Sequence, residues 1–414
     1  MTANAPYVQI PLYLVQVSPG EIKVGIKIAI NGGLPMLYEL DTGASGFYPA
    51  AEIPANKGVS STSLAWWTDF QAPAGIASFT QKYSSGNCYT AVSTPATLTF
   101  EGNSYIYSSE TNAYQAGPVP AVTVNVGAVI GATNSNNSGF AENWVQSLTN
   151  ANTDIANGDS VTAGPLDSYF FGDFGIGLGN AANGAADEGA PVLAVLPQFP
   201  FPFCTQFTIA LGAQPCEADW KKATNNTIAQ GVLTLLVPPT SFGDNPIPVA
   251  MNPATPPQFY PSSGVLPFPP ITTFDQAQIN ADFSLSNPAN TADISAVPMV
   301  LDTGCPSMVI HLGESGALSL STGSQLEDLL IETGTPNGKG KITVINGTQV
   351  SFQPAVTTAF KADNGANSVS ATLLTANKPG KQNGYVNTSI RTFFDNTVTF
   401  SLSDGTLTLY PQKG

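Results

Sequence analysis

The sequence predicts a mainly β protein, and three observations support this fold class. Apolar residues recur at a period of two in several short runs, of which 22–30 is the clearest. Glycine and proline, 39 and 34 of the 414 residues, separate these runs as turns separate short strands. Helical periodicity is restricted to the short segments 140–148, 192–196 and 326–332. Many short strands joined by turns are typical of β folds.

The first predicted strand, 22–30, ends at Asn31-Gly32-Gly33, a sequence typical of a tight hairpin turn. Further strands are predicted along the chain at 96–100, 230–235 and 397–402. A stretch dense in proline and aromatic residues, 237–270, has the composition of a connection between lobes. We therefore expect two domains, a first lobe over 1–238 and a second over 239–414.

The charge of the chain limits its partners. Lys, Arg, Asp and Glu make up only 10% of the residues, and 13 basic against 28 acidic side chains leave a net charge of −15. Nucleic acids and anionic membrane surfaces are bound through clusters of Lys and Arg, so neither is expected as a partner. No run of 18 apolar residues predicts a membrane span. A content of 42% hydrophobic residues is enough for a large core and argues against disorder.

The scarcity of basic residues also bears on the cellular setting. At pH 2 the chain would carry a charge of about +15, whereas an ordinary composition of this length would carry on the order of +50. Less self-repulsion in acid favours an acidic, secreted or extracellular setting. An alternative is that the composition only follows the surface of a secreted protein. Residues 1–6 show no signal peptide.

Histidine and cysteine are both rare. His311 is the single histidine, and the four cysteines lack zinc-type spacing, so no metal site and no cofactor are expected. Cys204 and Cys216 enclose a short loop and are predicted to form a disulfide, which favours an export compartment. Cys88 and Cys305 either pair with each other or stay free.

The most informative feature is a repeated tripeptide. Asp41-Thr42-Gly43 is echoed by Asp302-Thr303-Gly304, and each copy follows a strand-like run ending in Leu. Average residue usage gives roughly 0.1 such tripeptides by chance in a chain of this length. A single Asp at a strand end is explained by a simple turn motif. Two copies with similar flanks point instead to a shared role.

Two carboxyl groups about 3 Å apart share one proton, so that one acts as a base and the other as an acid. Such a pair activates water and protonates a carbonyl oxygen without a metal or a covalent intermediate. Glycine after threonine lets the backbone turn under the carboxylate. The threonine hydroxyls are expected to lock the two loops together.

These residues resemble the pepsin-type aspartic proteases, and the likeness covers most of the chain. The run 21–41 resembles the family's approach to its first catalytic Asp, 173–178 resembles the strand behind it, and 268–283 with 299–304 resembles the approach to the second. The resemblance implies a mainly β, bilobal fold with the active-site cleft between two β-barrel-like lobes. It implies an aspartic endopeptidase, a monomer that acts on polypeptides in acid or mild acid.

The resemblance also assigns residues. Asp41 and Asp302 are the expected catalytic pair, supported by Thr42, Gly43, Thr303 and Gly304. The turn Tyr83-Ser84-Ser85-Gly86 matches the flap hairpin, and Tyr89 competes with Tyr83 for the flap role. Tyr48 stands where the family usually has a Trp that supports the flap. Substrate contacts are expected from Tyr83, Ser84, Ser45, Tyr48, Gly43, Gly304 and Cys305.

The sequence departs from the family pattern in several places. Ala44 and Cys305 replace the Ser or Thr that usually follows each Asp-Thr-Gly, and the loss of those hydroxyls should raise the pKa values of the pair. A pH optimum in mild acid follows. The catalytic residues are 261 positions apart, so inserted loops are expected around 133–164 and 237–261. Near Asn387 the glycine expected behind the second Asp is missing.

Two readings of the function remain open. The first is the endopeptidase. The second is a non-catalytic binding or inhibitor protein of the same fold, which would have no reason to keep a costly pair of like charges. An extracellular β-rich surface protein would explain the composition but not the repeated motif. A Ser-His-Asp hydrolase built on His311 has no partner residues in the sequence.

Overall fold

The computed structural model describes sixteen stretches of the chain: 5–54, 62–83, 85–159, 161, 164–177, 195–200, 202–236, 246–253, 274, 278–286, 291–306, 308–312, 339–344, 349–351, 369–373 and 385–412. Only the backbone is described for residue 62, for 281–286, for 291–297 and for the strands between 308 and 373. Ser84 and the predicted helix 326–332 lie outside the described residues.

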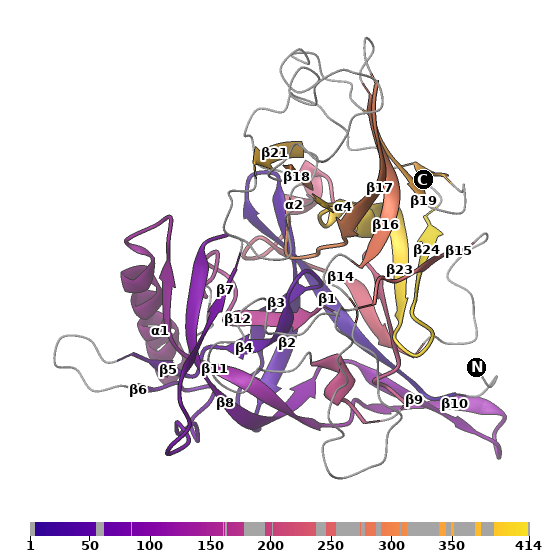
Figure 1. Cartoon of the computed structure of the whole chain (residues 1–414). Helices are drawn as coiled ribbons and strands as arrows, with labels where there is room; N and C mark the ends of the chain where they lie inside the picture. Colours follow the sequence, from indigo (N-terminus) through magenta and orange to yellow (C-terminus); the bar gives the residue numbers. More distant parts are fainter. Residues whose placement is uncertain are drawn as a thin grey trace.

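The described chain is mainly β, which confirms the predicted fold class (Figure 1). In the N-terminal half, the strands are β1 (Tyr7–Ser18), β2 (Glu21–Ile30), β3 (Met36–Asp41), β4 (Ser45–Pro49), β5 (Glu52–Ile53), β6 (Thr62–Ser63), β7 (Phe79–Lys82), β8 (Asn87–Phe100), β9 (Asn103–Ser108), β10 (Ala113–Pro118), β11 (Val122–Asn134) and β12 (Gly172–Ile176). The remaining strands are β13 (Gln206–Ala210), β14 (Thr227–Leu235), β15 (Ile247–Ala250), β16 (Ile279–Ser286), β17 (Thr291–Val300), β18 (Met308–Leu312), β19 (Lys339–Val344), β20 (Gln349–Ser351), β21 (Val369–Leu373), β22 (Tyr385–Asn387), β23 (Asn396–Ser401) and β24 (Thr406–Pro411). The described helices are α1 (Phe140–Asn157), α2 (Glu217–Trp220), α4 (Arg391–Asp395) and the short 3-10 helix η1 (Leu196–Gln198).

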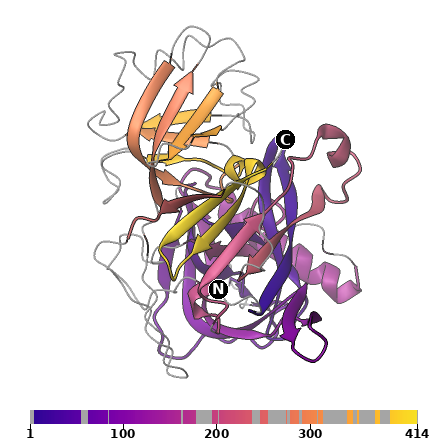
Figure 2. The same ribbon diagram turned by 90° about the vertical axis from the view of Figure 1, so that its right-hand side faces the viewer.

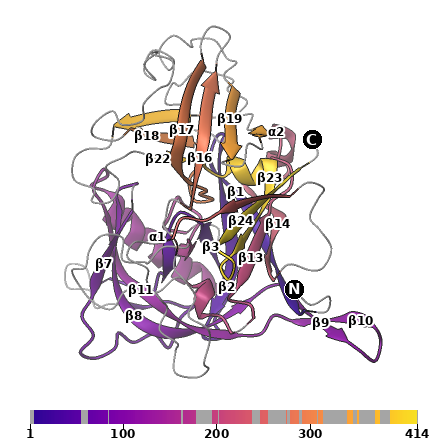
Figure 3. The ribbon, with the colours of Figure 1, turned by 45° about the vertical axis from the view of Figure 1, so that its right-hand side comes forward.

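One large sheet of fifteen strands forms the body of the molecule. Its main path runs β15-β24-β23-β13-β14-β1-β2-β3-β12-β4. The long β8–β11 ribbon pairs with this path through β2, and β9 and β10 project from it beside the N-terminus (Figure 3). The sheet therefore gathers strands from both ends of the sequence.

A second sheet of seven strands stands apart from the N-terminal strands, as Figure 2 shows. Its order is β20-β19-β16-β17-β22-β18-β21. The boundary predicted at residue 238 does not coincide with the division between the sheets. The C-terminal segment supplies this second sheet, but it also adds β15, β23 and β24 to the large one.

The two sheets contain the same four-strand unit. In the first, β3 pairs antiparallel with β2 and parallel with β12, which pairs antiparallel with β4. In the second, β17 pairs antiparallel with β16 and parallel with β22, which pairs antiparallel with β18. Each unit ends its second strand at an Asp-Thr-Gly, so equivalent positions deliver Asp41 and Asp302.

Aromatic packing fixes the first unit. The ring of Phe47 on β4 lies edge-on to Tyr38 on β3 at 4.9 Å and to Phe174 on β12 at 5.2 Å. All three side chains are fully buried. Edge-to-face pairs of this kind add to the free energy gained by burial, so they hold the three strands that surround Asp41 in register.

Helix α1 confirms the helix predicted at 140–148 and extends beyond it to Asn157. Trp144, Leu148 and Ala151 recur at helical spacing and are its buried face. The helix ends at Gly158, whose φ of 78° suits glycine. Of the predicted segment 192–196, residues 192–194 lie outside the described residues, and Leu196 begins the 3-10 helix η1. Among the helices described, none has the length and apolar character to cross a bilayer.

The predicted Cys204–Cys216 disulfide is absent, and none of the four cysteines, all described, forms a disulfide. Thr205, next to Cys204, pairs with Leu402 just after β23, whereas Gln214 contacts Arg391 before the start of β23. The two cysteines therefore lie toward opposite ends of that strand. A disulfide requires Cα atoms within about 7 Å, and the extended β13 between the cysteines separates them.

The junction between β13 and β23 provides a test of the large sheet. Phe207 and Phe400 stack at 4.6 Å and are both buried, joining strands from distant segments. We expect Phe400→Ala to lower the free energy of unfolding by about 3–5 kcal/mol, measured by chemical denaturation. The control Ile106→Ala, at a side chain that is 63% exposed, should change it by less than about 0.5 kcal/mol. Equal losses in the two variants would contradict this junction.

Candidate active site

The two Asp-Thr-Gly loops meet through a reciprocal exchange of hydrogen bonds. The Thr42 hydroxyl donates to the Leu301 carbonyl at 2.6 Å and accepts from the Thr303 amide at 3.0 Å. The Thr303 hydroxyl donates to the Leu40 carbonyl at 2.6 Å and accepts from the Thr42 amide at 3.1 Å. Both threonines are buried. The lock expected from the sequence is thus present, and each loop satisfies the buried polar groups of the other.

Each glycine of the motif lies against the carboxyl group of the opposite loop. A Cβ atom added at Gly43 would lie 2.5 Å from Cγ of Asp302, and one added at Gly304 would lie 2.6 Å from Cγ of Asp41. No side chain fits at these distances, so glycine is required for close approach and not only for the turn. The symmetry of the two contacts brings Asp41 and Asp302 together.

Hydrogen bonds orient the two carboxyl groups differently. Asp41 Oδ1 accepts from the amides of Gly43 at 2.6 Å and Ala44 at 3.1 Å. Asp302 Oδ1 accepts from the Gly304 amide at 2.9 Å, and its Oδ2 accepts from the side-chain amide of Asn387 at 2.6 Å. Asp41 thus accepts from two backbone amides, and Asp302 accepts from one backbone amide and from the side chain of Asn387.

Two supporting residues were not identified from the sequence. Gln278 is fully buried; its side chain donates to the Thr42 carbonyl at 3.1 Å and accepts from the Leu301 amide at 2.6 Å. Asn387, on β22, lies beside β17, where the family pattern predicted a glycine. The missing glycine was the one sequence signal for Asn387. Nothing in the sequence distinguishes Gln278 from other polar residues.

The electrostatics of the pair favour a shared proton. Burial raises the pKa of Asp41 well above its usual range, and the nearby charges of Asp302, Asp173 and Glu39 raise it further. Both catalytic candidates keep part of their surface exposed, so water can reach them. A partly exposed pair of carboxyl groups that holds one proton can act as base and acid toward a bound water molecule.

A buried ion pair lies behind Asp41. Lys23 contacts Glu39 at 2.9 Å and Asp167 at 2.6 Å, and Glu39 precedes Asp41 by two residues on β3. Burial raises the pKa of Glu39 to about 7, although Lys23 opposes the shift. This carboxyl therefore takes up a proton below neutral pH.

Some of the residues predicted to contact substrate lie beside Asp41 and Asp302, and others are buried inside the protein. Gly43 and Gly304 lie at the dyad, and Cys305 is partly exposed next to it, with its carbonyl accepting from the Ile390 amide. Ser45 is buried and donates to the Gly177 carbonyl, and Tyr48 is buried with its hydroxyl on Gln81. The side chains of Ser45 and Tyr48 therefore pack inside the protein and are not available to a ligand.

Tyr83 lies at the turn of the β7–β8 hairpin, between the end of β7 and the start of β8. Its amide donates to the Asn87 carbonyl at 2.8 Å, which closes the hairpin. The ring of Tyr83 lies 6.4 Å from that of Tyr48 and 5.2 Å from that of Tyr89. Its hydroxyl is buried. Tyr89 itself is buried in the core, so of the two competitors Tyr83 is the one at the turn.

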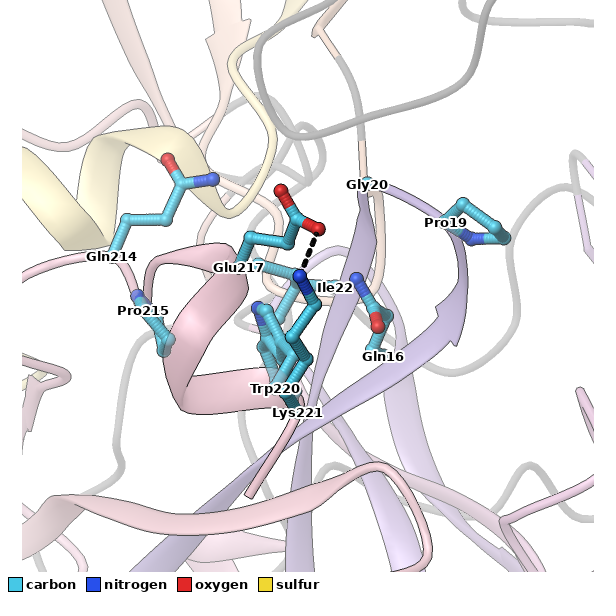
Figure 4. Close-up of a pocket in the computed structure, with 9 residues that line it drawn as sticks. All are labelled: Gln16, Pro19, Gly20, Ile22, Gln214, Pro215, Glu217, Trp220 and Lys221. Carbon is cyan, nitrogen blue, oxygen red and sulfur yellow. Dashed lines mark ion pairs between the residues drawn. The ribbon is translucent and has the colours of Figure 1, made fainter. Parts of the chain in front are cut away.

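A separate hollow of about 510 Å³ lies between the β1–β2 turn and α2 (Figure 4). Gln16, Ile22, Gln214 and Trp220 contribute to its wall, and no residue of the two Asp-Thr-Gly loops does. It is not part of the candidate site. Within the described ranges, no group of three or more potential metal ligands is present.

Comparison with known proteins adds no identification. No protein-family model matches the sequence. No curated protein matches it either.

The hydrogen bonds that Thr42 and Thr303 exchange predict that two substitutions of Thr42 will differ in their effect on stability. Thr42→Val should lower the free energy of unfolding by about 2–4 kcal/mol, because it leaves the Leu301 carbonyl and the Thr303 amide buried without their partner. Thr42→Ser keeps the hydroxyl and should cost less than about 1.5 kcal/mol. Urea denaturation of both variants measures this. Equal losses for valine and serine would mean that the hydroxyl does not join the loops.

The raised pKa of Glu39 predicts that the free energy of unfolding falls as the pH approaches neutral. Its pKa is about 7 in the folded chain against 4.5 ordinarily, so the folded state binds the proton more tightly than the unfolded state. The contribution is fully present below pH 4.5 and is lost by pH 7, at a cost on the order of 3 kcal/mol.

Denaturation across pH 4 to 8 measures this loss, and Glu39→Gln should flatten the dependence in that window. Asp159→Asn, at an exposed carboxyl, serves as the control. A Glu39→Gln profile as steep as the wild-type profile would show that Glu39 is not the titrating group.

Proposed function

We propose that this protein is an aspartic endopeptidase with a bilobal, pepsin-like fold, in which Asp41 and Asp302 form the catalytic pair. The observation that carries the proposal is the reciprocal seating of the two Asp-Thr-Gly loops, with each glycine against the other loop's carboxyl. A protein without catalytic use for these residues would gain nothing from holding two like charges in partial burial. The four-strand unit present in both sheets supports a bilobal origin of the site.

The proposed reaction uses one ionised and one protonated carboxyl. The ionised group takes a proton from water, whose oxygen attacks the carbonyl carbon of the peptide bond, and the protonated group gives its proton to the carbonyl oxygen. In the second step, the carboxyl that accepted the water proton protonates the amide nitrogen. The other carboxyl recovers a proton from the intermediate as the C–N bond breaks. The pair thereby returns to its starting state.

The substrate class follows from the same proposal. An extended polypeptide binds such a site by strand-like backbone hydrogen bonds, with side chains in alternating subsites. The scarcity of Lys and Arg suits work in acid outside the cell, because charge repulsion at low pH stays small. We propose a secreted protein that acts as a monomer, with the cleft between its two lobes.

Removal of either carboxyl tests the proposal. Asp41→Asn and Asp302→Asn should each lower the rate of cleavage of a denatured protein by at least about 10³-fold between pH 2 and 7, because neither variant can share a proton. A statine-type transition-state analogue should inhibit the wild type. Asp159→Asn should keep full activity. Equal inactivity of the wild type and Asp41→Asn at every pH would leave the non-catalytic binding protein as the better account.

The pH profile is a second test. Activity requires one proton on the pair, so the alkaline limb follows the higher of the two pKa values. Because the pKa of Asp41 is raised, the optimum should lie in mild acid. Ala44→Ser offers a hydroxyl to the Asp41 carboxylate, stabilises its charged form and should move that limb to lower pH. A profile that peaks near pH 2 and does not change in Ala44→Ser would contradict this.

A further inference from the structure

The two carboxyl groups of the candidate pair receive their hydrogen bonds in different patterns. Asp41 accepts both of its bonds at Oδ1, from two backbone amides of its own loop. Asp302 accepts at both oxygens, at Oδ1 from the Gly304 amide at 2.9 Å and at Oδ2 from the side chain of Asn387 at 2.6 Å. The bond from Asn387 is therefore what distinguishes Asp302 from Asp41.

The orientation of the Asn387 amide is fixed by the turn that it begins. Its Oδ1 accepts from the Ser389 backbone amide at 2.9 Å, and a backbone N–H can only donate. The side-chain nitrogen of Asn387 must therefore face Asp302. Asn387 is 8% exposed and Ser389 is fully buried, so the donor is held in place with little competition from water.

The two bonding patterns favour opposite protonation states. When a carboxyl is protonated, the oxygen that carries the hydrogen becomes a poor acceptor. Asp41 can carry a proton at Oδ2 and still accept both of its bonds at Oδ1. At Asp302, a proton on either oxygen weakens a bond from an N–H donor, and such donors favour the charged form of a carboxyl.

The charges on the Asp41 side of the pair act in the same direction. Burial raises the pKa of Asp41 well above its usual range, and the charges of Asp302, Asp173 and Glu39 raise it further. Lys23, the basic side chain that contacts Glu39, is shared with a second carboxylate. Asp41 therefore holds a proton more readily than an isolated carboxyl does.

The side chains close to Asp302 on its own side carry no charge in acid. Tyr385, on β22, and Cys305 lie close enough to interact electrostatically with each other and with Asp302. Phenols and thiols ionise only above neutral pH, so both are neutral where the carboxyl pair titrates. The amide of Asn387 is thus a permanent donor in surroundings that add no negative charge.

The equivalent position of the first four-strand unit lacks this donor. Asn387 pairs with the residue two positions before Asp302, and Asp173 pairs with the residue two positions before Asp41. Asp173 makes no hydrogen bond to Asp41, and an ionised carboxyl has no hydrogen to donate. The two halves of the site therefore differ at a structurally equivalent residue.

We propose that Asn387 is a positioning residue that decides which carboxyl of the pair is ionised: its amide keeps Asp302 as the carboxylate and leaves the shared proton on Asp41. The catalytic consequence rests on the proposed function. There, Asp302 takes a proton from water as the water oxygen attacks the carbonyl carbon, and Asp41 gives its proton to the carbonyl oxygen. Asp302 then passes its new proton to the amide nitrogen, and Asp41 recovers a proton from the intermediate as the C–N bond breaks.

Carbon-13 NMR of labelled aspartate carboxyl groups tests the position of the proton without reference to activity. The signals of Asp41 and Asp302 are identified with Asp41→Asn and Asp302→Asn, and are followed in the wild type from pH 8 to pH 2. The first proton that the pair binds should go to Asp41, with a preference of at least about tenfold, the effect of one hydrogen bond to a charged group. A first proton on Asp302, or equal sharing, would overturn the proposal.

Two substitutions of Asn387 test its part in this preference. Asn387→Ser removes the donor to Asp302 but keeps an acceptor for the Ser389 amide, because a serine hydroxyl can replace the amide oxygen in such a turn. The preference for Asp41 should fall by about tenfold or more. Asn387→Ala removes both groups and should lose the same preference with a larger loss of stability. A preference that stays unchanged in Asn387→Ser would overturn the role of Asn387.

Thr392→Val is the matched control. The Thr392 hydroxyl donates to the Thr388 hydroxyl at 2.7 Å, next to the turn of Asn387, and both threonines are buried. The valine should lower the free energy of unfolding but keep the wild-type titration of both carboxyls. A loss of preference as large as in Asn387→Ser would show a general effect of loosening this region and would overturn the proposal.

Cleavage assays separate this inference from the proposed function. If the wild type hydrolyses peptides, Asn387→Ser should move the acid limb of kcat/KM upward by about one pH unit, because the pair then binds its second proton more readily. The alkaline limb, set by Asp41, should move less. An acid limb that does not move would overturn the catalytic role of Asn387.

The NMR and cleavage results can also disagree. If the proton lies on Asp41 while the wild type is inert, the placement of the proton stands and the endopeptidase proposal fails. If the wild type cleaves peptides while the first proton lies on Asp302, the endopeptidase proposal stands and this inference fails.

Discussion

The two Asp-Thr-Gly loops are joined by hydrogen bonds that Thr42 and Thr303 exchange across 261 residues of sequence. Each threonine occupies the backbone groups of the opposite loop, so neither loop is satisfied alone. Gln278 adds a further pair of bonds to the same junction. The strands and the glycines around the junction position the two loops for this contact. The repeated four-strand units end their second strands at one point, and glycine at Gly43 and Gly304 lets each loop approach the other's carboxyl.

The junction of the two Asp-Thr-Gly loops brings several acidic side chains close together, and few basic side chains lie near enough to neutralise them. Asp41, Glu39 and Asp173 share a face of the first sheet, Asp302 adjoins them, and Lys23 is occupied by two carboxylates. The interior therefore depends on bound protons more than on ion pairs. The composition of the chain is consistent with this arrangement, since a protein that holds its carboxyls neutral has little need for Lys and Arg at pH values where those protons remain bound.

The sequence was sufficient for features that are local. Period-two runs gave the mainly β class, and the repeated tripeptide gave the two loops and the threonine lock. The sequence was insufficient for side chains whose position depends on which strands pair in the folded chain. Asn387 and Gln278 act because register places them beside loops that are distant in sequence, and no local pattern encodes that. Ser45 and Tyr48 are near the motif, yet both faces of β4 are covered, so both side chains are buried. The Cys204–Cys216 pairing failed because a strand, and not a compact loop, lies between the cysteines.

The late strands β23 and β24 complete a sheet that begins with β1. A ribosome releases the N-terminal strands first, so the growing polypeptide holds an unfinished sheet edge until β23 and β24 emerge. Contacts at such long sequence separation also form slowly. Asp302 and the amide of Asn387 arrive in the same final portion. A chain that ends before Asp302 therefore carries a solitary carboxyl instead of a pair.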